Sequence, residues 1–435
     1  MDERTKARTN RRLALQAELD AGKSGGERNR LGQFATPPAL AEEMLRLAGA
    51  LLPRNAPVRF LDPAFGTGAF YAALLASFPA GRVTSAQGYE VDPHYGGPAG
   101  ALWAGTGLDL VLGDFTQAVA PVAECEKATL VVCNPPYVRH HHLDVETKGR
   151  LRAASLQAAG VDLNGLAGLY CHFVCLCQPW MAKGALAMWL VPSEFMDVNY
   201  GRPLKEYLLR KVTLLRIHRF DPSDVQFGDA LVSSAVVCFV NSPPRRDQAV
   251  DFTFGGTLQR PRHRRTWPAE ELDAAGKWTG LALAGSSGRP AGDRAKLADL
   301  FAIRRGIATG SNEFFVMGEA AASIAGIPRR FLRPILPSPR YLPSDEIAAD
   351  AEGNPLIERR LFLLDCRLPP EQIRQRYLSL WRYLSSEAAQ RIRDRYLCRH
   401  RTLIAPTAGA GQRLCFVRAM MCSWSSCGRS LNICE

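Results

Sequence analysis

The chain has 435 residues, a length that at roughly 100–200 residues per domain suggests two domains or three. It is 47% hydrophobic and 22% charged, as ordinary globular proteins are, which excludes wholesale disorder. Lys and Arg outnumber Asp and Glu by 54 to 42, and this net charge of +12 favours a polyanionic partner, although a basic soluble surface would also account for it. No apolar run approaches the ~18–20 residues that span a bilayer, and the start, MDERTKARTN, lacks an apolar signal core. We therefore expect a cytosolic protein with no membrane partner.

Short β-branched runs alternate with helical patterns over residues 31–243, which is typical of a mostly parallel, Rossmann-like α/β sheet. The clearest strands are expected at 58–62, 86–92, 108–115, 130–134, 185–192, 212–220 and 233–240. Helices are expected at 39–52 and 169–184, where apolar residues recur at helical spacing.

The flanking segments differ in composition from this domain. Residues 1–30 form a polar extension that predicts a helix followed by a flexible joint. The Arg-, Pro- and Gly-rich residues 244–295 predict a linker with a loose excursion. Residues 296–401 lack the strand–helix alternation and predict a second domain of α+β type, whereas residues 402–435 form an atypical tail without periodicity.

The sharpest local feature is LDPAFGTGAF (61–70), which lies between a strand and a helical pattern. Glycines at 66 and 68 let a ligand approach the backbone closely, at the strand end where α/β sheets bind ligands. A dinucleotide-binding fingerprint would need a third small residue at position 71, where this chain has Tyr71. A Gly-x-Gly turn alone is therefore a weak signal of a binding site, and its interpretation depends on the strand ends that follow.

The next two strand ends carry residues that suit a nucleoside. Glu90 lies 22 residues beyond Gly68 and could accept hydrogen bonds from both ribose hydroxyls. Asp114 could accept from an exocyclic adenine amine while Phe115 covers the ring. Taken singly, Glu90 is compatible with a solvated strand end and Asp114 with a turn. Three consecutive strand ends with suitable residues favour the binding site.

The fourth strand runs into Asn134-Pro135-Pro136-Tyr137. Two prolines fix φ and remove two N–H donors, which gives a stiff loop. The Asn134 amide oxygen and the Pro135 carbonyl are two acceptors for an exocyclic –NH₂ group, and Tyr137 offers an aromatic face. These residue types suit a planar base with an amine, although the same residues also occur in simple turns.

Together, DPAFGTG, YEVDP, GDF and NPPY resemble an S-adenosylmethionine-dependent amino-methyltransferase. Their order, with GQFATPP (32–38) upstream, resembles the gamma class of N6-adenine DNA methyltransferases of the TaqI-like, restriction–modification type. The segments IRRGIATGSNEFFV (303–316) and FLRPILPSP (331–339) resemble that family's C-terminal target-recognition domain.

The resemblance implies a role for each matched residue. Thr36 and Pro37 would contact the methionine part of the cofactor, and Asp62, Gly66 and Gly68 would form the turn beside its amino-acid part. Glu90 would bind the ribose of the cofactor, and Asp114 and Phe115 would bind its adenine. Asn134, Pro135, Pro136 and Tyr137 would grip the target adenine, with Phe227 as a further stacking ring. The implied cofactor is S-adenosyl-L-methionine, and the implied partners are double-stranded DNA and a cognate restriction endonuclease.

Several alternatives remain open at this point. NPPY is shared with methyltransferases of protein glutamine or RNA, which would not need residues 296–401. The resemblance stops near Arg401, where the family carries a Pro-Trp-Tyr-like segment, so an inactive DNA-binding remnant with a truncated or frameshifted tail is a third reading. We expect no metal, because neither His140-His141-His142 nor the tail cysteines have the spacing of metal ligands.

Overall fold

The computed structural model describes residues 3–79, 81–221, 233–283, 308–337, 341–342, 344, 346–351, 354–395 and 398. The chain divides into two compact units, Met1–Pro290 and Ala291–Glu435. Each unit has its own hydrophobic core.

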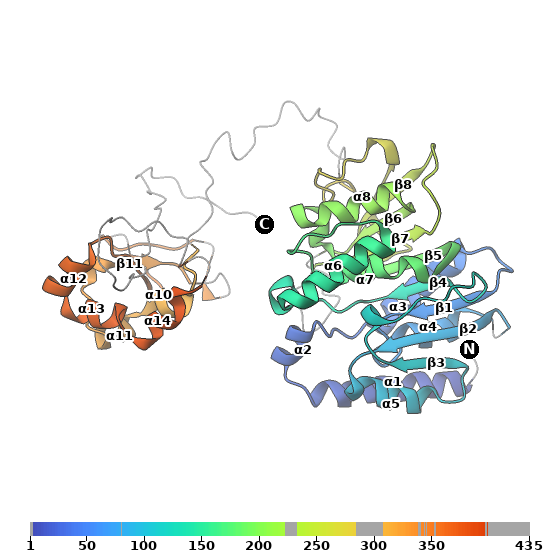
Figure 1. The fold of residues 1–435 in the computed structure, drawn as a ribbon, viewed down its shortest axis with the longest axis horizontal. Helices are drawn as coiled ribbons and strands as arrows, with labels where there is room; N and C mark the ends of the chain where they lie inside the picture. The colour runs from blue at the N-terminus through green and yellow to red at the C-terminus, as the bar shows by residue number, and fades with distance from the viewer. Residues whose placement is uncertain are drawn as a thin grey trace. The chain divides into compact units, whose positions relative to one another are not determined.

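One mixed sheet organises the first unit, and nine strands of the described residues belong to it, in the order β3-β2-β1-β4-β5-β7-β6-β8-β9 (Figure 1). The strands are β1 Val58–Asp62, β2 Val83–Glu90, β3 Leu108–Leu112, β4 Ala128–Cys133, β5 Met181–Pro192, β6 Thr213–Arg219, β7 Ser234–Val240, β8 Ala249–Gly256 and β9 Pro261–Pro268. Strands β1 to β5 are parallel, whereas β7 pairs antiparallel with both β5 and β6. The mostly parallel, Rossmann-like sheet expected from the sequence is confirmed.

Helices cover both faces of this sheet, so the unit has three layers (Figure 1). The helices of one face are α1 Glu3–Ala21, α3 Pro38–Leu51, α4 Ala69–Ser77 and α5 Pro93–Trp103. The helices of the other face are α6 Val145–Ala159, α7 Leu169–Leu176 and α8 Arg202–Arg210. Because both faces are covered, the central strands are almost continuously apolar, as β4 (ATLVVC) shows.

The N-terminal 1–30 segment is more ordered than the sequence predicted. Helix α1 packs against α4 and α5, and the guanidinium of Arg12 is buried, with Nη1 3.3 Å from Thr67 Oγ1. In place of the expected flexible joint, α2 (Gly25–Leu31) begins with a capping box in which Ser24 and Glu27 bond each other's backbone N–H. The capping box satisfies N–H groups that a helix start leaves unpaired. The S-x-x-E spacing of Ser24 and Glu27 is the sequence signal for this helix start.

Two further expectations differ from the structure. The helix expected over 169–184 ends at Leu176, because Pro179 follows, and β5 begins at Met181. The expected linker over 244–295 contains β8 and β9, and β8 pairs with β6 to extend the sheet. Exposed arginines on β9 gave this segment a linker-like composition, but charged side chains are also usual on the outermost strand of a sheet.

The second unit has the expected α+β composition. Three strands of its described residues form an antiparallel sheet in the order β10-β12-β11. Its elements are α10 Asn312–Phe315, β10 Val316–Gly318, α11 Glu319–Ile324, β11 Leu332–Ile335, β12 Leu361–Leu364, α12 Pro370–Arg376, α13 Leu378–Leu384 and α14 Glu387–Arg393. The helices and the sheet share one apolar core, which includes Phe315, Phe362 and Leu380. Within the described parts of the chain, no helix is long and apolar enough to cross a membrane.

Gly68 provides a test of the packing between β1 and α4. It has a φ of +88°, and a Cβ there would lie 2.6 Å from the Phe65 ring and 2.7 Å from Trp103 Nε1. We expect Gly68→Ala to lower the free energy of unfolding by at least ~1–3 kcal/mol, the cost of a left-handed non-glycine residue, plus the cost of the overlap.

The matched control is Gly97→Ala in α5, where a Cβ meets nothing within 4 Å. Alanine in a helix interior should raise the free energy of unfolding by ~0.5–1 kcal/mol relative to glycine. Urea denaturation of both variants checks the pair, and equal stabilities would contradict the packing described for Gly68.

Candidate active site

A cavity of about 640 Å³ opens at the carboxyl ends of β1, β2, β3 and β4. From β1 the chain first adds β2 and β3 on one side. It then returns to the other side of β1, where it adds β4 and β5, so the strand order reverses between β1 and β4. A crevice forms where the order reverses, and open α/β sheets bind their ligands there. Six of the expected site residues line this cavity, and they are Gly66, Glu90, Asp114, Phe115, Asn134 and Pro136.

The two glycines of the first loop have different functions. Gly66, at φ +56°, lines the cavity, and a Cβ there would meet nothing within 4 Å. Its N–H donates to Glu90 Oε2 at 2.8 Å. Gly68 does not line the cavity, because it begins α4 against Phe65 and Trp103. The loop therefore exposes its backbone to a ligand at Gly66 and packs the helix at Gly68.

Glu90 is held in place by the backbone on both sides. Its Oε1 accepts from the N–H of Asp92 at 2.9 Å, and its Oε2 accepts from Gly66. Burial raises the pKa of Glu90, although these two hydrogen bonds oppose the shift. Each carboxylate oxygen has two lone pairs, so acceptor capacity remains for hydroxyl groups in the cavity.

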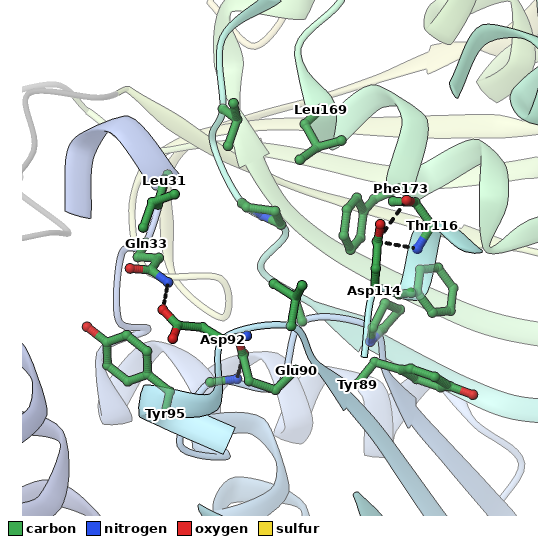
Figure 2. Close-up of a pocket in the computed structure, with 18 of the residues that line it drawn as sticks. Leu31, Gln33, Tyr89, Glu90, Asp92, Tyr95, Asp114, Thr116, Leu169 and Phe173 are labelled. Carbon is green, nitrogen blue, oxygen red and sulfur yellow. Dashed lines mark hydrogen bonds between the residues drawn. The ribbon is translucent and has the colours of Figure 1, made fainter. Parts of the chain in front are cut away.

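Asp114 and Phe115 form a second wall of the cavity. Asp114 Oδ1 accepts from the N–H of Thr116 at 2.9 Å, and its Oδ2 lies 3.7 Å from Arg150 Nη2. Burial would raise the pKa of Asp114, but hydrogen bonds from Gln117 and Thr116 outweigh it and the pKa is lowered. Asp114 therefore presents an ionised acceptor, and Figure 2 shows it on the side of the cavity opposite the Gln33–Asp92 hydrogen bond. The buried ring of Phe115 packs beside Phe173, which also lines the cavity.

The Asn134 amide has a fixed orientation. Its Nδ2 donates to the carbonyl oxygen of Phe34 at 2.9 Å and to Thr36 Oγ1 at 3.1 Å. Because a carbonyl can only accept, the –NH₂ group must face Phe34. The Asn134 Oδ1 is buried and has no hydrogen-bond partner among the described residues. A buried acceptor without a partner is costly, so a ligand N–H at this point would be favoured.

The rest of the NPPY loop is divided between the cavity and the core. Pro136 lines the cavity, whereas Pro135 is buried and does not. Tyr137 is buried, and its hydroxyl donates to the carbonyl of Leu190 at 3.2 Å. Its ring packs against Phe34, with ring centroids 5.6 Å apart, and does not line the cavity. Stacking of Tyr137 on a base stays a prediction.

Three other expected residues, Thr36, Pro37 and Asp62, do not lie on the cavity wall. Thr36 is buried and contacts Asn134, and Pro37 precedes α3. Asp62 is 1% exposed, and its Oδ1 accepts from the N–H of Ala64 at 3.2 Å. Phe227 lies outside the described residues. The functions expected for these residues stay predictions.

The N-terminal helices supply cavity residues that the sequence did not indicate. Gln16, Asp20 and Lys23 line the cavity from α1 and its end, and Gln33 follows α2. Lys23 Nζ and Gln33 Nε2 both donate to Asp92, which follows β2. Arg150 on α6 also lines the cavity. Gln33 lies in the GQFATPP segment, whereas Gln16, Asp20, Lys23 and Arg150 carry no motif, so only their position in the fold assigns these four to the site.

The fold and the cavity together define an α/β domain with a largely apolar cavity at its strand ends, whose wall carries the acceptors of Glu90, Asp114 and Asn134. Comparison with known families shows what kind of domain this is. Residues 114–226 match the Eco57I restriction-modification methylase family, and residues 289–403 match the C-terminal domain of Type II methyltransferase M.Eco57I. The two segments are thus similar to an Eco57I-type methylase and to the C-terminal domain of M.Eco57I, which confirms the resemblance to restriction–modification methyltransferases expected from the sequence.

Individual relatives agree with these matches. Type II methyltransferase M.XamI of Xanthomonas campestris pv. amaranthicola is 29% identical over 310 residues, which cover 70% of this chain and 56% of that protein. Type II methyltransferase M.AccI of Acinetobacter calcoaceticus is 24% identical over 396 residues, which cover 86% of this chain and 68% of that protein. The chain thus spans little more than half of M.XamI.

Among solved structures, the type IIG restriction endonuclease BpuSI aligns over 83% of this chain and 45% of its own, with a TM-score of 0.46 and 17% identity. A class I S-adenosylmethionine-dependent methyltransferase from Listeria monocytogenes, described as putative, aligns over 58% of this chain and 74% of its own, with a TM-score of 0.46 and 16% identity.

Asp62 predicts a pH dependence of stability. Burial raises the pKa of its carboxyl group from 3.8 to about 8, so the folded state keeps a proton that the unfolded state releases above about pH 4. The unfolded state therefore binds fewer protons between these two values, and stability falls as pH rises through this window.

Asp62→Asn removes this titration and retains the acceptor for Ala64. We expect the wild type to lose stability relative to Asp62→Asn between about pH 4 and pH 8, at no more than ~1.4 kcal/mol per pH unit, and to level off above it. Urea denaturation in a pH series measures the difference, and parallel curves would contradict the raised pKa.

Proposed function

We propose that this chain is a site-specific DNA methyltransferase that methylates the N6 amine of an adenine in duplex DNA, with S-adenosyl-L-methionine as methyl donor. The observation that carries the proposal is the Asn134 amide, whose nitrogen is bound by Phe34 and Thr36 while its oxygen has no partner among the described residues. An oriented acceptor beside a nucleoside-sized cavity suits an exocyclic amine. The matches to restriction–modification methylases support the same reaction.

The cavity residues fit S-adenosylmethionine. When bound, this cofactor supplies an electrophilic methyl group on a sulfonium. The held carboxylate of Glu90 suits the two ribose hydroxyls, and ionised Asp114 suits the exocyclic amine of the cofactor's adenine. The open space at Gly66 allows close approach to the backbone. Lys23, Asp20 and Gln16 add charged and polar groups beside this loop.

At the target base, the chain's contribution would be orientation. An adenine amine is a weak nucleophile because its lone pair is delocalised into the ring. Hydrogen bonds to Asn134 Oδ1 and to the Pro135 carbonyl would hold both amine hydrogens and favour a pyramidal nitrogen. Orientation of this kind lowers a barrier without an acid, a base or a metal. The base must first leave the duplex, at a cost of a few kcal/mol, which stacking on Tyr137 and Phe227 would partly offset.

The second unit is proposed to bind the DNA. Its match to the C-terminal domain of a Type II methyltransferase favours DNA over protein glutamine or RNA as the substrate. Arg329, Arg330 and Arg333 are exposed there, whereas Arg304 and Arg305 lie outside the described residues. We infer that the protein works in the cytosol of a bacterium or archaeon as part of a restriction–modification system with a cognate endonuclease.

In the direct test, the full chain is incubated with labelled S-adenosylmethionine and, in parallel reactions, with DNA, RNA or protein. We expect label in DNA alone and, after digestion to nucleosides, in N6-methyladenine. Label in protein would support the glutamine alternative, label in RNA the second alternative, and binding of DNA without transfer the inactive remnant. Label in methylcytosine would overturn the adenine assignment.

Asn134→Ala and Glu90→Ala should have opposite effects. Asn134→Ala removes an acceptor for the target amine, and we expect turnover to fall ~10²–10³-fold, as when an oxyanion-hole donor is lost, with cofactor affinity within a few-fold of wild type. Glu90→Ala removes a charged acceptor for the ribose and should weaken cofactor binding by roughly 10–150-fold. Calorimetric titration and labelled transfer measure the two effects, and equal effects on binding would refute the division of functions.

The arginines of the second unit can be tested by salt dependence. Arg329 donates to Asn354 at 2.8 Å and Arg330 to the hydroxyl of Tyr377 at 2.8 Å, so both guanidinium groups are oriented on the surface. If each contacts a phosphate, each alanine variant should reduce the slope of log affinity against log salt by ~0.9. Filter binding over a salt series measures this slope.

The control is Arg202→Ala on α8, an exposed arginine in an i,i+4 ion pair with Glu206. Its removal should leave the slope unchanged. A slope that falls in the control and not in the two variants would place the DNA contacts on the first unit.

A further inference from the structure

The segment 32–36 and the loop that begins at Asn134 are fitted closely to each other. The N–H of Tyr137 donates to the carbonyl of Gly32 at 3.1 Å, and the rings of Phe34 and Tyr137 are in contact. Gly32 has a φ of +66°, and a Cβ there would lie 2.3 Å from the Tyr137 nitrogen. Only glycine fits at this position, so the two segments form one packed unit.

Within this unit, the hydroxyl of Thr36 is directed at the Asn134 amide. An amide –NH₂ has two hydrogens, and here the Phe34 carbonyl takes one and Thr36 Oγ1 the other. Thr36 is itself buried and does not line the cavity, unlike its neighbours Gln33, Phe34 and Ala35. This geometry is unsuited to a direct contact with a ligand in the cavity. It is suited to holding Asn134.

Both partners are needed to define the direction of the amide. The Phe34 carbonyl sets which end of the amide is nitrogen, but one hydrogen bond leaves rotation about the side-chain torsion. The second hydrogen bond, to Thr36, restrains that rotation and fixes where Oδ1 points. A rotation of the amide would turn the second hydrogen away from its acceptor and leave a buried donor unpaired, which is costly.

We propose that Thr36 is a positioning residue that fixes the acceptor oxygen of Asn134 toward the amine of the target base. The inference rests on the proposed function and deepens it. It also replaces the cofactor contact that the sequence suggested for Thr36. Because Gln33, Phe34 and Ala35 line the cofactor cavity, the segment that touches the cofactor is the same one that orients the target acceptor.

Two substitutions separate the hydroxyl from the methyl group of Thr36. Thr36→Val keeps the shape and removes the acceptor, and we expect the kcat for transfer to unmodified genomic DNA to fall about tenfold. Tenfold corresponds to ~1.4 kcal/mol. The KM and Kd for S-adenosylmethionine should stay within about twofold. Thr36→Ser restores the hydroxyl and should restore kcat to within about twofold of wild type. A rate equal to wild type in Thr36→Val, or a loss in Thr36→Ser of the same size, would overturn the proposal.

A double variant tests whether Thr36 acts through Asn134. In the Asn134→Ala background there is no amide to orient, so Thr36→Val should cause no further loss in single-turnover transfer, normalised to the sites that bind cofactor. A further tenfold loss would show that Thr36 acts independently and would overturn the inference.

A spectroscopic measurement keeps the inference testable whatever the substrate is. The side-chain ¹⁵N–¹H₂ signals of Asn134, assigned by their loss in Asn134→Ala, should shift in Thr36→Val and remain near their wild-type position in Thr36→Ser. Unchanged signals in Thr36→Val would overturn the hydrogen bond. Absence of transfer by the wild type to any DNA, with these shifts present, would instead refute the proposed function alone.

Discussion

The parallel alignment of β1, β2, β3 and β4 is the constraint on which the site depends. Asp62 at the end of β1 is opposite Gly88 of β2, and Glu90 at the end of β2 is opposite Leu112 of β3. Parallel strands end at the same edge of a sheet, so four loops that are far apart in the sequence meet at one cavity. Strands β1 and β4 are mostly buried, and a shift of one residue would turn their core side chains to the wrong face. Burial of the strands therefore also fixes the loops.

The polar groups of the cavity share one physical arrangement. Three side chains of its wall are fixed by hydrogen bonds and keep acceptor capacity: Glu90 accepts from the N–H groups of Gly66 and Asp92, Asp114 accepts from Thr116 and Gln117, and Asn134 donates its Nδ2 hydrogens to residues 34 and 36. Acceptors oriented in advance need little reorganisation when a ligand arrives, which is why such sites stabilise developing charge and geometry efficiently. The cavity is thus prepared by its supporting contacts as much as by the residues that face it.

The N-terminal helices belong to the same arrangement, although their sequence is mostly polar. Arg12 and Gln16 both contact Thr67 in the loop after β1, and Lys23 bonds to Asp92 after β2. Helix α1 is thereby attached to two of the four loops that form the cavity. Polar side chains here make tertiary contacts that a reading for apolar periodicity does not detect.

The sequence by itself determined the architecture and the chemical character of the site. Short β-branched runs that alternate with helical patterns indicated a mostly parallel α/β sheet, and the residues expected at the strand ends, Gly66, Glu90, Asp114, Phe115 and Asn134, all line the cavity. Local residue types sufficed for these predictions because strand burial and strand-end chemistry depend on short stretches of the chain.

Only the tertiary structure shows which way Asn134 faces, that Gly68 and Thr36 contact the site from behind its wall, and that Lys23 and Arg150 line the cavity. It also decided that β8 and β9 extend the sheet, because an edge strand with exposed arginines has the composition of a linker until its partner strand is known. These features depend on contacts between segments up to 100 residues apart, such as Phe34 with Asn134, and no local pattern records such a contact.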